Sequence, residues 1–272
     1  MTNDDIEIID VTPELAGSWL AANTLNRKIR PRQVKIYAAD MTNGDWTWTG
    51  EPVRFDTAGR LIDGQHRLHA IMTSGATIRL LVVRNLPPVA QQDIDNGIPR
   101  KFNDVLTLRG ESNASDLGAI IRQVVAWNRG LPAADAATVA SVHEMLRVLD
   151  EHPELRDVTK RAAVWSRGIH LPRSVIGLLF WVFSRVDEES YDDALEFFDR
   201  LASETDHHQG EPIYELRRTL QAGTSASARS RSRTWLTAVT IKAWNAYRRG
   251  EQVAIYRYRP GGAKPESFPE PV

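Results

Sequence analysis

The clearest structural signal in the sequence is the stretch Arg60-Leu61-Ile62-Asp63-Gly64-Gln65-His66-Arg67-Leu68-His69-Ala70-Ile71. It begins as a short apolar strand that ends in an acid and a glycine, and it continues as an amphipathic helix. A glycine at such a junction lets the backbone pass close to a ligand, and the N–H groups of the first helical turn favour an anion. The stretch therefore predicts a polar site between two hydrophobic elements. A helix start that is merely capped by the Asp63 side chain is equally compatible with these residues.

Strand and helix patterns alternate on both sides of this stretch as far as about residue 110. Residues 57–59 predict a tight turn between two strands, and residues 77–83 are rich in the β-branched side chains that favour a strand. The predicted strands cover residues 6–11, 52–56, 60–63 and 77–83, and the predicted helices cover residues 13–23, 32–42, 64–75 and 100–108.

From about residue 113 onward the pattern is helical. The segment 173–185 is apolar nearly all round, which predicts a helix at the centre of this half. The predicted helices cover residues 115–129, 135–150, 154–167, 173–185, 190–204, 212–222 and 234–249, and an extended tail follows. We therefore expect an α+β protein, with a small mixed α/β domain at residues 1–110 and a helical domain at residues 111–272.

The composition excludes several classes of chemistry. The chain has no cysteine, so disulfides, zinc–thiolate sites and thiol catalysis are excluded. Its longest apolar runs, such as residues 175–183, are too short to span a membrane, and the N-terminus lacks the apolar region of a signal peptide. We expect a cytoplasmic protein without a membrane partner.

The net charge is −1, but the charges are unevenly distributed. Acids concentrate in the segment 187–206 and bases in the segment 229–259. The basic segment is compatible with DNA binding, for which Arg229, Arg231 and Arg233 are the candidate contacts. It is equally compatible with packing of the two segments against each other, or with an assembly contact.

The first turn of the helix that follows Gly64 carries side chains suited to phosphate. The guanidinium of Arg67 is a planar fork of donors, Gln65 adds an amide donor, and His66 can donate or shuttle a proton. Asp63 is placed to act as a base or to hold a divalent cation. These residue types predict a phosphate-containing ligand, most plausibly a nucleotide. His66 and His69 have a spacing that could bind a metal, but a solvent-facing His69 is the preferred interpretation.

The stretch from Gly50 to Ala70 resembles the ParB N-terminal domain and sulfiredoxin superfamily. In those proteins a G-x-x-R or G-x-H-R sequence at the same junction binds nucleotide phosphates, and Gly64, Gln65, His66 and Arg67 match it residue by residue. Asn26-Arg27 is similar to the Asn-x-Arg region of partition proteins, although the spacing differs. The D-G-Q-H-R sequence also resembles proteins of DNA-modification and phage systems that share this fold. A largely uncharacterised family from actinobacteria and their phages is similar in three other stretches: Met41-x-x-Gly44-x-Trp46, Asp95-x-Gly97-x-x-Arg100 and Ile241-Lys242-Ala243-Trp244-Asn245-Ala246.

The resemblance implies CTP or ATP as the bound nucleotide, with Mg²⁺, and it leaves a homodimer open. Sulfiredoxins use a cysteine at this motif, so the reduction of sulfinic acid is excluded for this chain. A second polar cluster contains Asp95 and Arg100, which could complete the phosphate site; a plain loop is the alternative. Asp63 and His66 are the candidate catalytic residues, and Asp63 is the candidate metal ligand.

Two kinds of function follow. The first is a nucleotide-binding protein that hydrolyses an NTP or transfers a phosphoryl group, in DNA metabolism or phage biology. The second is a DNA-binding regulatory protein in which the ParB-like domain is a scaffold. A ParB-like nuclease ranks below both, because the sequence lacks a recognisable cluster of metal-binding carboxylates.

Overall fold

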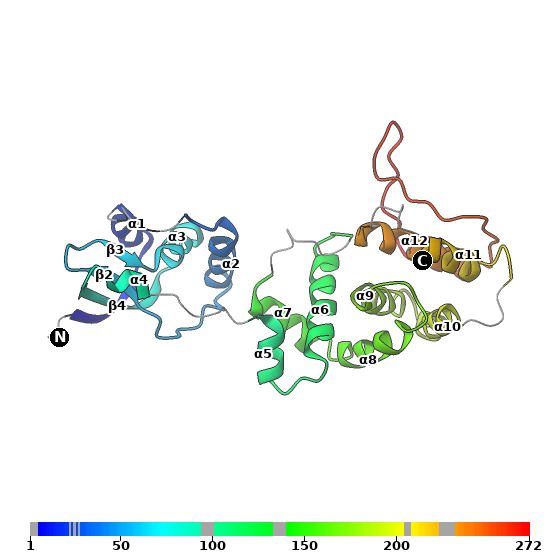
Figure 1. The fold of residues 1–272 in the computed structure, drawn as a ribbon, viewed down its shortest axis with the longest axis horizontal. Helices are drawn as coiled ribbons and strands as arrows, with labels where there is room; N and C mark the ends of the chain where they lie inside the picture. Colours follow the sequence, from blue (N-terminus) through cyan, green and yellow to red (C-terminus); the bar gives the residue numbers. More distant parts are fainter. Residues whose placement is uncertain are drawn as a thin grey trace. The chain divides into compact units, whose positions relative to one another are not determined.

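The computed structural model describes residues 5–21, 23, 26, 28–93, 101–132, 140–203, 208–222 and 232–272. The chain divides into two compact units, one built from residues 1–99 and 139–143 and the other from residues 100–138 and 144–272. We call them the N-terminal unit and the helical unit (Figure 1). The division expected from the sequence lies at about residue 110.

The N-terminal unit is built on a mixed sheet. Its strands lie in the order β1-β4-β2-β3, with β1 antiparallel to β4, β4 parallel to β2, and β2 antiparallel to β3. The strands are β1 (Ile6–Val11), β2 (Val53–Asp56), β3 (Leu61–Asp63) and β4 (Ile78–Leu86), and the helices are α1 (Pro13–Ala21), α2 (Pro31–Thr42), α3 (Gln65–Ser74) and the short α4 (Ala90–Asp93). Helix α3 packs against both α1 and α2.

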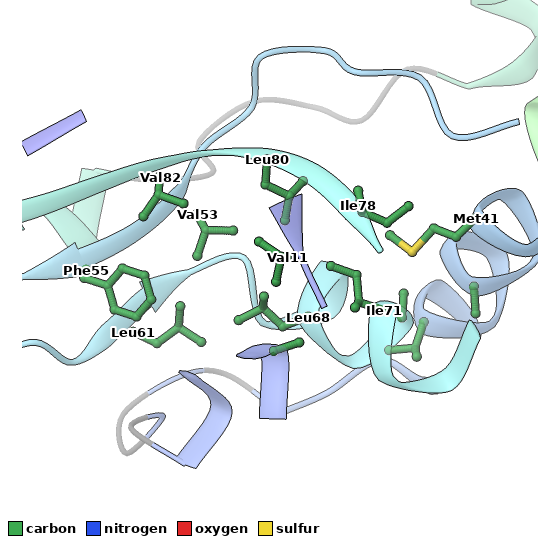
Figure 2. Close-up of a cluster of buried hydrophobic side chains, with 14 residues drawn as sticks. Val11, Met41, Val53, Phe55, Leu61, Leu68, Ile71, Ile78, Leu80 and Val82 are labelled. Carbon is green, nitrogen blue, oxygen red and sulfur yellow. The ribbon is translucent and has the colours of Figure 1, made fainter. Parts of the chain in front are cut away.

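The core of this unit lies between one face of the sheet and α3. Val53 and Val82 of the sheet face the same interior as Leu68 and Ile71 of α3, and all four side chains are fully buried (Figure 2). Burial of one such side chain stabilises the fold by about 1.5–3 kcal/mol. The apolar positions of α3 therefore fix its orientation, and with it the position of the polar first turn.

The helical unit is arranged around one buried helix. Helix α9 (Arg173–Phe183) is buried from Ser174 to Phe183 and packs against α6, α8, α10 and α12, which surround it (Figure 1). The other helices are α5 (Phe102–Leu108), α6 (Ala114–Asn128), α7 (Val142–Glu151), α8 (Leu155–Trp165), α10 (Ser190–Ala202), α11 (Pro212–Gln221) and α12 (Arg233–Arg248). The prediction of a central helix at residues 173–185 is confirmed.

The tail that follows α12 is held against the helical unit by hydrogen bonds and ring contacts. The side-chain amide of Asn245 in α12 donates to the carbonyl of Glu270 (2.8 Å) and accepts the N–H of Val272 (3.0 Å). The ring of Phe268 packs edge-on against Trp127 of α6 and Tyr258, with centroid distances of 6.4 and 5.8 Å. The tail is thus anchored at several points.

The predicted α+β class is confirmed: a small mixed sheet with helices is followed by a helical region. Strand β4 continues to Leu86, beyond the predicted end at residue 83. The predicted helix at residues 135–150 is described only from residue 140 onward, where α7 begins at Val142. Among the described residues, no helix is both long enough and apolar enough to cross a membrane.

Candidate functional site

Gly64 forms the junction between β3 and α3. Its φ of 104° lies in the left-handed region, and a Cβ atom added there would lie 2.9 Å from Cγ2 of the buried Val53. Glycine is therefore required both by the backbone and by the close approach of β2. The residue is the N-cap of α3, and the helix starts without a side-chain hydrogen bond at this cap. The alternative in which Asp63 caps α3 is wrong.

Asp63 lies between two arginines at the end of β3. Its Oδ2 atom is 2.7 Å from Nη1 of Arg54 and 3.2 Å from Nη2 of Arg67. Asp63 was predicted as a base or metal ligand, and the structure places two guanidinium groups on one of its carboxylate oxygens. These two guanidinium groups compete with a metal ion for that oxygen.

Arg67 is directed into the protein. Besides Asp63, its guanidinium donates to the carbonyl of Pro52 (2.7 Å) and to the carbonyl of Glu51. The side chain is only 12% exposed. In this arrangement Arg67 joins α3 to the segment that leads into β2, which is a structural role that the sequence analysis did not predict.

A chain of amide side chains runs beside the start of α3. Asn23 donates to Oε1 of the buried Gln65 (3.1 Å), and Asn26 donates to Asn23 and to the carbonyl of Leu61 (2.6 Å each). Gln91 of α4 donates to Asn26 in turn (3.2 Å). The predicted residues Gln65 and Asn26 are thus brought together. Asn23 and Gln91 were missed, because neither lies in a recognisable motif.

His66 contacts the start of α2. Its Nε2 atom accepts the backbone N–H of Arg30, the N-cap of that helix, at 3.0 Å, and the side chain is buried. A ring nitrogen that accepts a hydrogen bond carries no proton, so the neutral imidazole holds its proton on Nδ1. Within the described ranges, His66 and His69 belong to no group of three or more potential metal ligands.

Trp46 and Trp48, which lie in the segment between α2 and β2, differ in exposure. Trp46 packs edge-on against Tyr37 of α2 with a centroid distance of 5.2 Å, so its ring belongs to the core. Trp48 is 53% exposed. Of the two, Trp48 is the ring with a surface on which a base could stack.

Five predicted residues lie outside the described residues: Arg27, Asp95, Arg100, Arg229 and Arg231. Arg233 is described, and it is the exposed first residue of α12.

Two basic residues of α12, Lys242 and Arg248, are engaged in ion pairs within the helical unit. Arg248 lies 2.7 Å from Asp187 and 3.2 Å from Asp193, and Lys242 pairs with Glu266 of the tail. For Arg248, the alternative in which the acidic and basic segments pack against each other is confirmed. The hydrogen bond from Arg248 holds the pKa of Asp187 below its ordinary value, against the opposing effect of partial burial.

Neither a family model, nor a curated protein, nor a solved structure matches the chain.

Proposed function

We propose that the N-terminal unit binds a nucleoside triphosphate, with the phosphates at the N-terminus of α3. The observation that carries the proposal is the glycine start of this helix. Gly64 brings the backbone close against β2, and α3 begins without a side-chain cap. A helix N-terminus presents N–H groups and the positive end of the helix dipole, which favour an anion.

The amide side chains around this start support the same proposal. Gln65, Asn23 and Asn26 are linked by hydrogen bonds, so each is held in one orientation. Neutral amides in fixed positions can recognise phosphate or ribose hydroxyl groups without the cost of burying an extra charge. The resemblance of residues 64–67 to the phosphate-binding sequence of ParB-like proteins also supports this class of ligand.

The geometry supports binding better than turnover. Asp63 is paired with two arginines, and Nε2 of His66 accepts a backbone N–H, so each candidate catalytic group already has a structural partner. Arg67 likewise binds backbone carbonyls. We therefore propose CTP or ATP as the ligand, with Mg²⁺ bound to the phosphates of the nucleotide. Hydrolysis or phosphoryl transfer is an extension of the proposal that needs these side chains to rearrange.

DNA binding by the basic segment is not put forward as a second function. Lys242 and Arg248 are engaged by Glu266, Asp187 and Asp193.

The test is a titration of the ¹⁵N-labelled protein with Mg²⁺·CTP and Mg²⁺·ATP, followed by NMR. We expect the backbone amide signals of Gln65 to Leu68 to shift with either or both nucleotides. Tripolyphosphate should shift the same signals, whereas cytidine and adenosine should not. If no nucleotide at millimolar concentration moves these signals, the proposal is wrong.

A matched pair of variants adds a second criterion. Gln65→Glu keeps an oxygen that can accept from Asn23 and adds a negative charge at the proposed phosphate position. Asn43→Asp adds the same charge at the C-cap of α2, where the residue is exposed. We expect Gln65→Glu to weaken nucleotide binding roughly tenfold and Asn43→Asp to leave it unchanged. Equal affinities for the two variants would contradict the proposal.

A further inference from the structure

A groove of about 590 Å³ lies between α12 and the tail of the helical unit. This volume is in the range of small-molecule sites in proteins. Its wall on α12 is formed by Lys242 and Ala246, and its other lining residues come from the segment after this helix: Glu251, Val253, Ile255, Tyr256, Arg257, Arg259 and Glu266.

The cations of the groove are not equivalent. Lys242 pairs with Glu266 and donates to the carbonyl of Arg257 (2.6 Å), so it is engaged in holding the tail. In the part of the chain that the structure describes, the guanidinium groups of Arg257 and Arg259 have no carboxylate at ion-pair distance, although Arg259 helps to lower the pKa of Glu266. Both side chains are exposed. The groove therefore has two guanidinium groups that are available to an anion.

The same groove has an apolar part. Ile255 is 51% exposed, although it lines the groove together with Val253 and Ala246. Exposure of apolar surface to water is unfavourable. A ligand with an apolar body would cover this surface.

Exposure alternates along residues 255–259 of the tail, as it does in an extended chain. Tyr256 and Tyr258 are buried, while the alternate residues Ile255, Arg257 and Arg259 are exposed. Alternate residues of an extended chain point to the same side, about 6.6 Å apart. The apolar contact and the two cations therefore stand on one side of the tail.

We propose that this groove binds a small amphipathic anion, with a carboxylate or phosphate head on Arg257 and Arg259 and an apolar body on Ile255 and Val253. Arginine is suited to both head groups, because its planar donors match the oxygens of either. This site is separate from the proposed nucleotide site and does not depend on it.

Isothermal titration of the full chain with octanoate, octyl phosphate and octan-1-ol tests the proposal. We expect at least one of the two anions to bind and octan-1-ol to bind much more weakly. Binding of only one anion identifies the head group. If neither anion binds, or if octan-1-ol binds as tightly as the better anion, the proposal is wrong.

Two double variants test whether the anion binds in this groove. The double variant Arg257→Ala/Arg259→Ala should weaken the anion about fivefold or more, as expected for the loss of exposed charge contacts. The matched control Arg122→Ala/Arg161→Ala removes two exposed arginines of the same unit that do not line the groove. It should bind as the natural sequence does. An equal loss in both double variants, with unchanged thermal unfolding, would overturn the assignment to this groove.

Discussion

At the scale of single residues, Gly64 has the most demanding position. Its backbone conformation is unfavourable for any residue that has a Cβ atom. A Cβ atom in place of one α-hydrogen would also lie too close to the side chain of Val53. Gly59 in the β2–β3 turn has a similarly positive φ of 74°, but no atom lies within 4 Å of a Cβ added there. Backbone strain is therefore expected for a substitution at either glycine, whereas steric overlap is expected only at Gly64.

We expect Gly64→Ala to lower the free energy of unfolding by about 2–4 kcal/mol and Gly59→Ala by only about 1 kcal/mol. The difference arises because only the first substitution also forces Val53 to move. Urea unfolding followed by circular dichroism measures both values. Equal losses for the two variants would show that the contact with Val53 relaxes freely.

Single residues also show what the sequence could not predict. The phosphate-like residue set of the first turn was recognised, but Asn23 and Gln65 are 42 positions apart and their hydrogen bond follows only from the packing of α1 against α3. Likewise, Arg67 looks like a ligand for a bound anion in the sequence, whereas its actual partners are Asp63 and the backbone carbonyls of Glu51 and Pro52. Every residue has a backbone carbonyl, so residue types do not indicate which carbonyl will accept a hydrogen bond.

At the scale of elements, hydrophobic periodicity predicted the strands and helices well. Helix α3 begins and ends at the predicted glycines, because Gly64 and Gly75 both adopt the left-handed conformation that terminates it. The order of the strands was not predicted, since the parallel pair β2 and β4 is separated by β3 and α3 in the sequence. Helices α6 and α9 approach closely at Gly177 of α9, where an added Cβ would lie 2.5 Å from Cδ1 of Ile120 in α6.

Gly177→Ala should therefore destabilise the helical unit by about 1–3 kcal/mol through overpacking. Ile120→Ala alone removes buried volume and should cost about 2–5 kcal/mol. The double variant should lose clearly less than the sum of the two, because the new methyl group occupies space that Ile120 leaves. Chemical unfolding of the three variants gives this coupling energy, and simple additivity would contradict the close approach of α6 and α9.

At the scale of the whole molecule, the distribution of charge had three interpretations in the sequence. Ion pairs of Arg248 with Asp187 and Asp193 support the interpretation in which the acidic and basic segments pack together. The sequence could not choose among them, because charge asymmetry alone does not tell whether the opposite charge lies in the same chain or in a partner. Because α12 packs near the start of α10, the opposite charges that Arg248 contacts lie in the same chain.

This packing predicts a dependence of stability on pH. The pKa of Asp187 is lowered in the folded chain from its ordinary value of 3.8, mainly by the hydrogen bond from Arg248. Its contribution is therefore present above pH 3.8 and is lost as the pH falls through the lower, folded value. We expect the free energy of unfolding of Asp187→Asn to fall less between pH 7 and pH 3 than that of the natural sequence.

Urea unfolding at the two pH values measures this difference. In an Arg248→Gln background the same substitution should have a smaller effect, because the largest cause of the lowered pKa of Asp187 has been removed while the backbone hydrogen bond from Glu189 remains. A pH dependence that is identical with and without Asp187 would exclude a role for this ion pair.

The attachment of the tail through Asn245 has a consequence for the chemical ageing of the protein. The side-chain amide serves the last residues as a neighbouring strand would, with one donor for Glu270 and one acceptor for Val272. Deamidation of Asn245 would replace the donor by a carboxylate oxygen that faces the carbonyl of Glu270 and repels it. Deamidation would thus weaken the attachment at Glu270 without any break in the chain, while the hydrogen bond from Val272 and the ring contacts of Phe268 would remain.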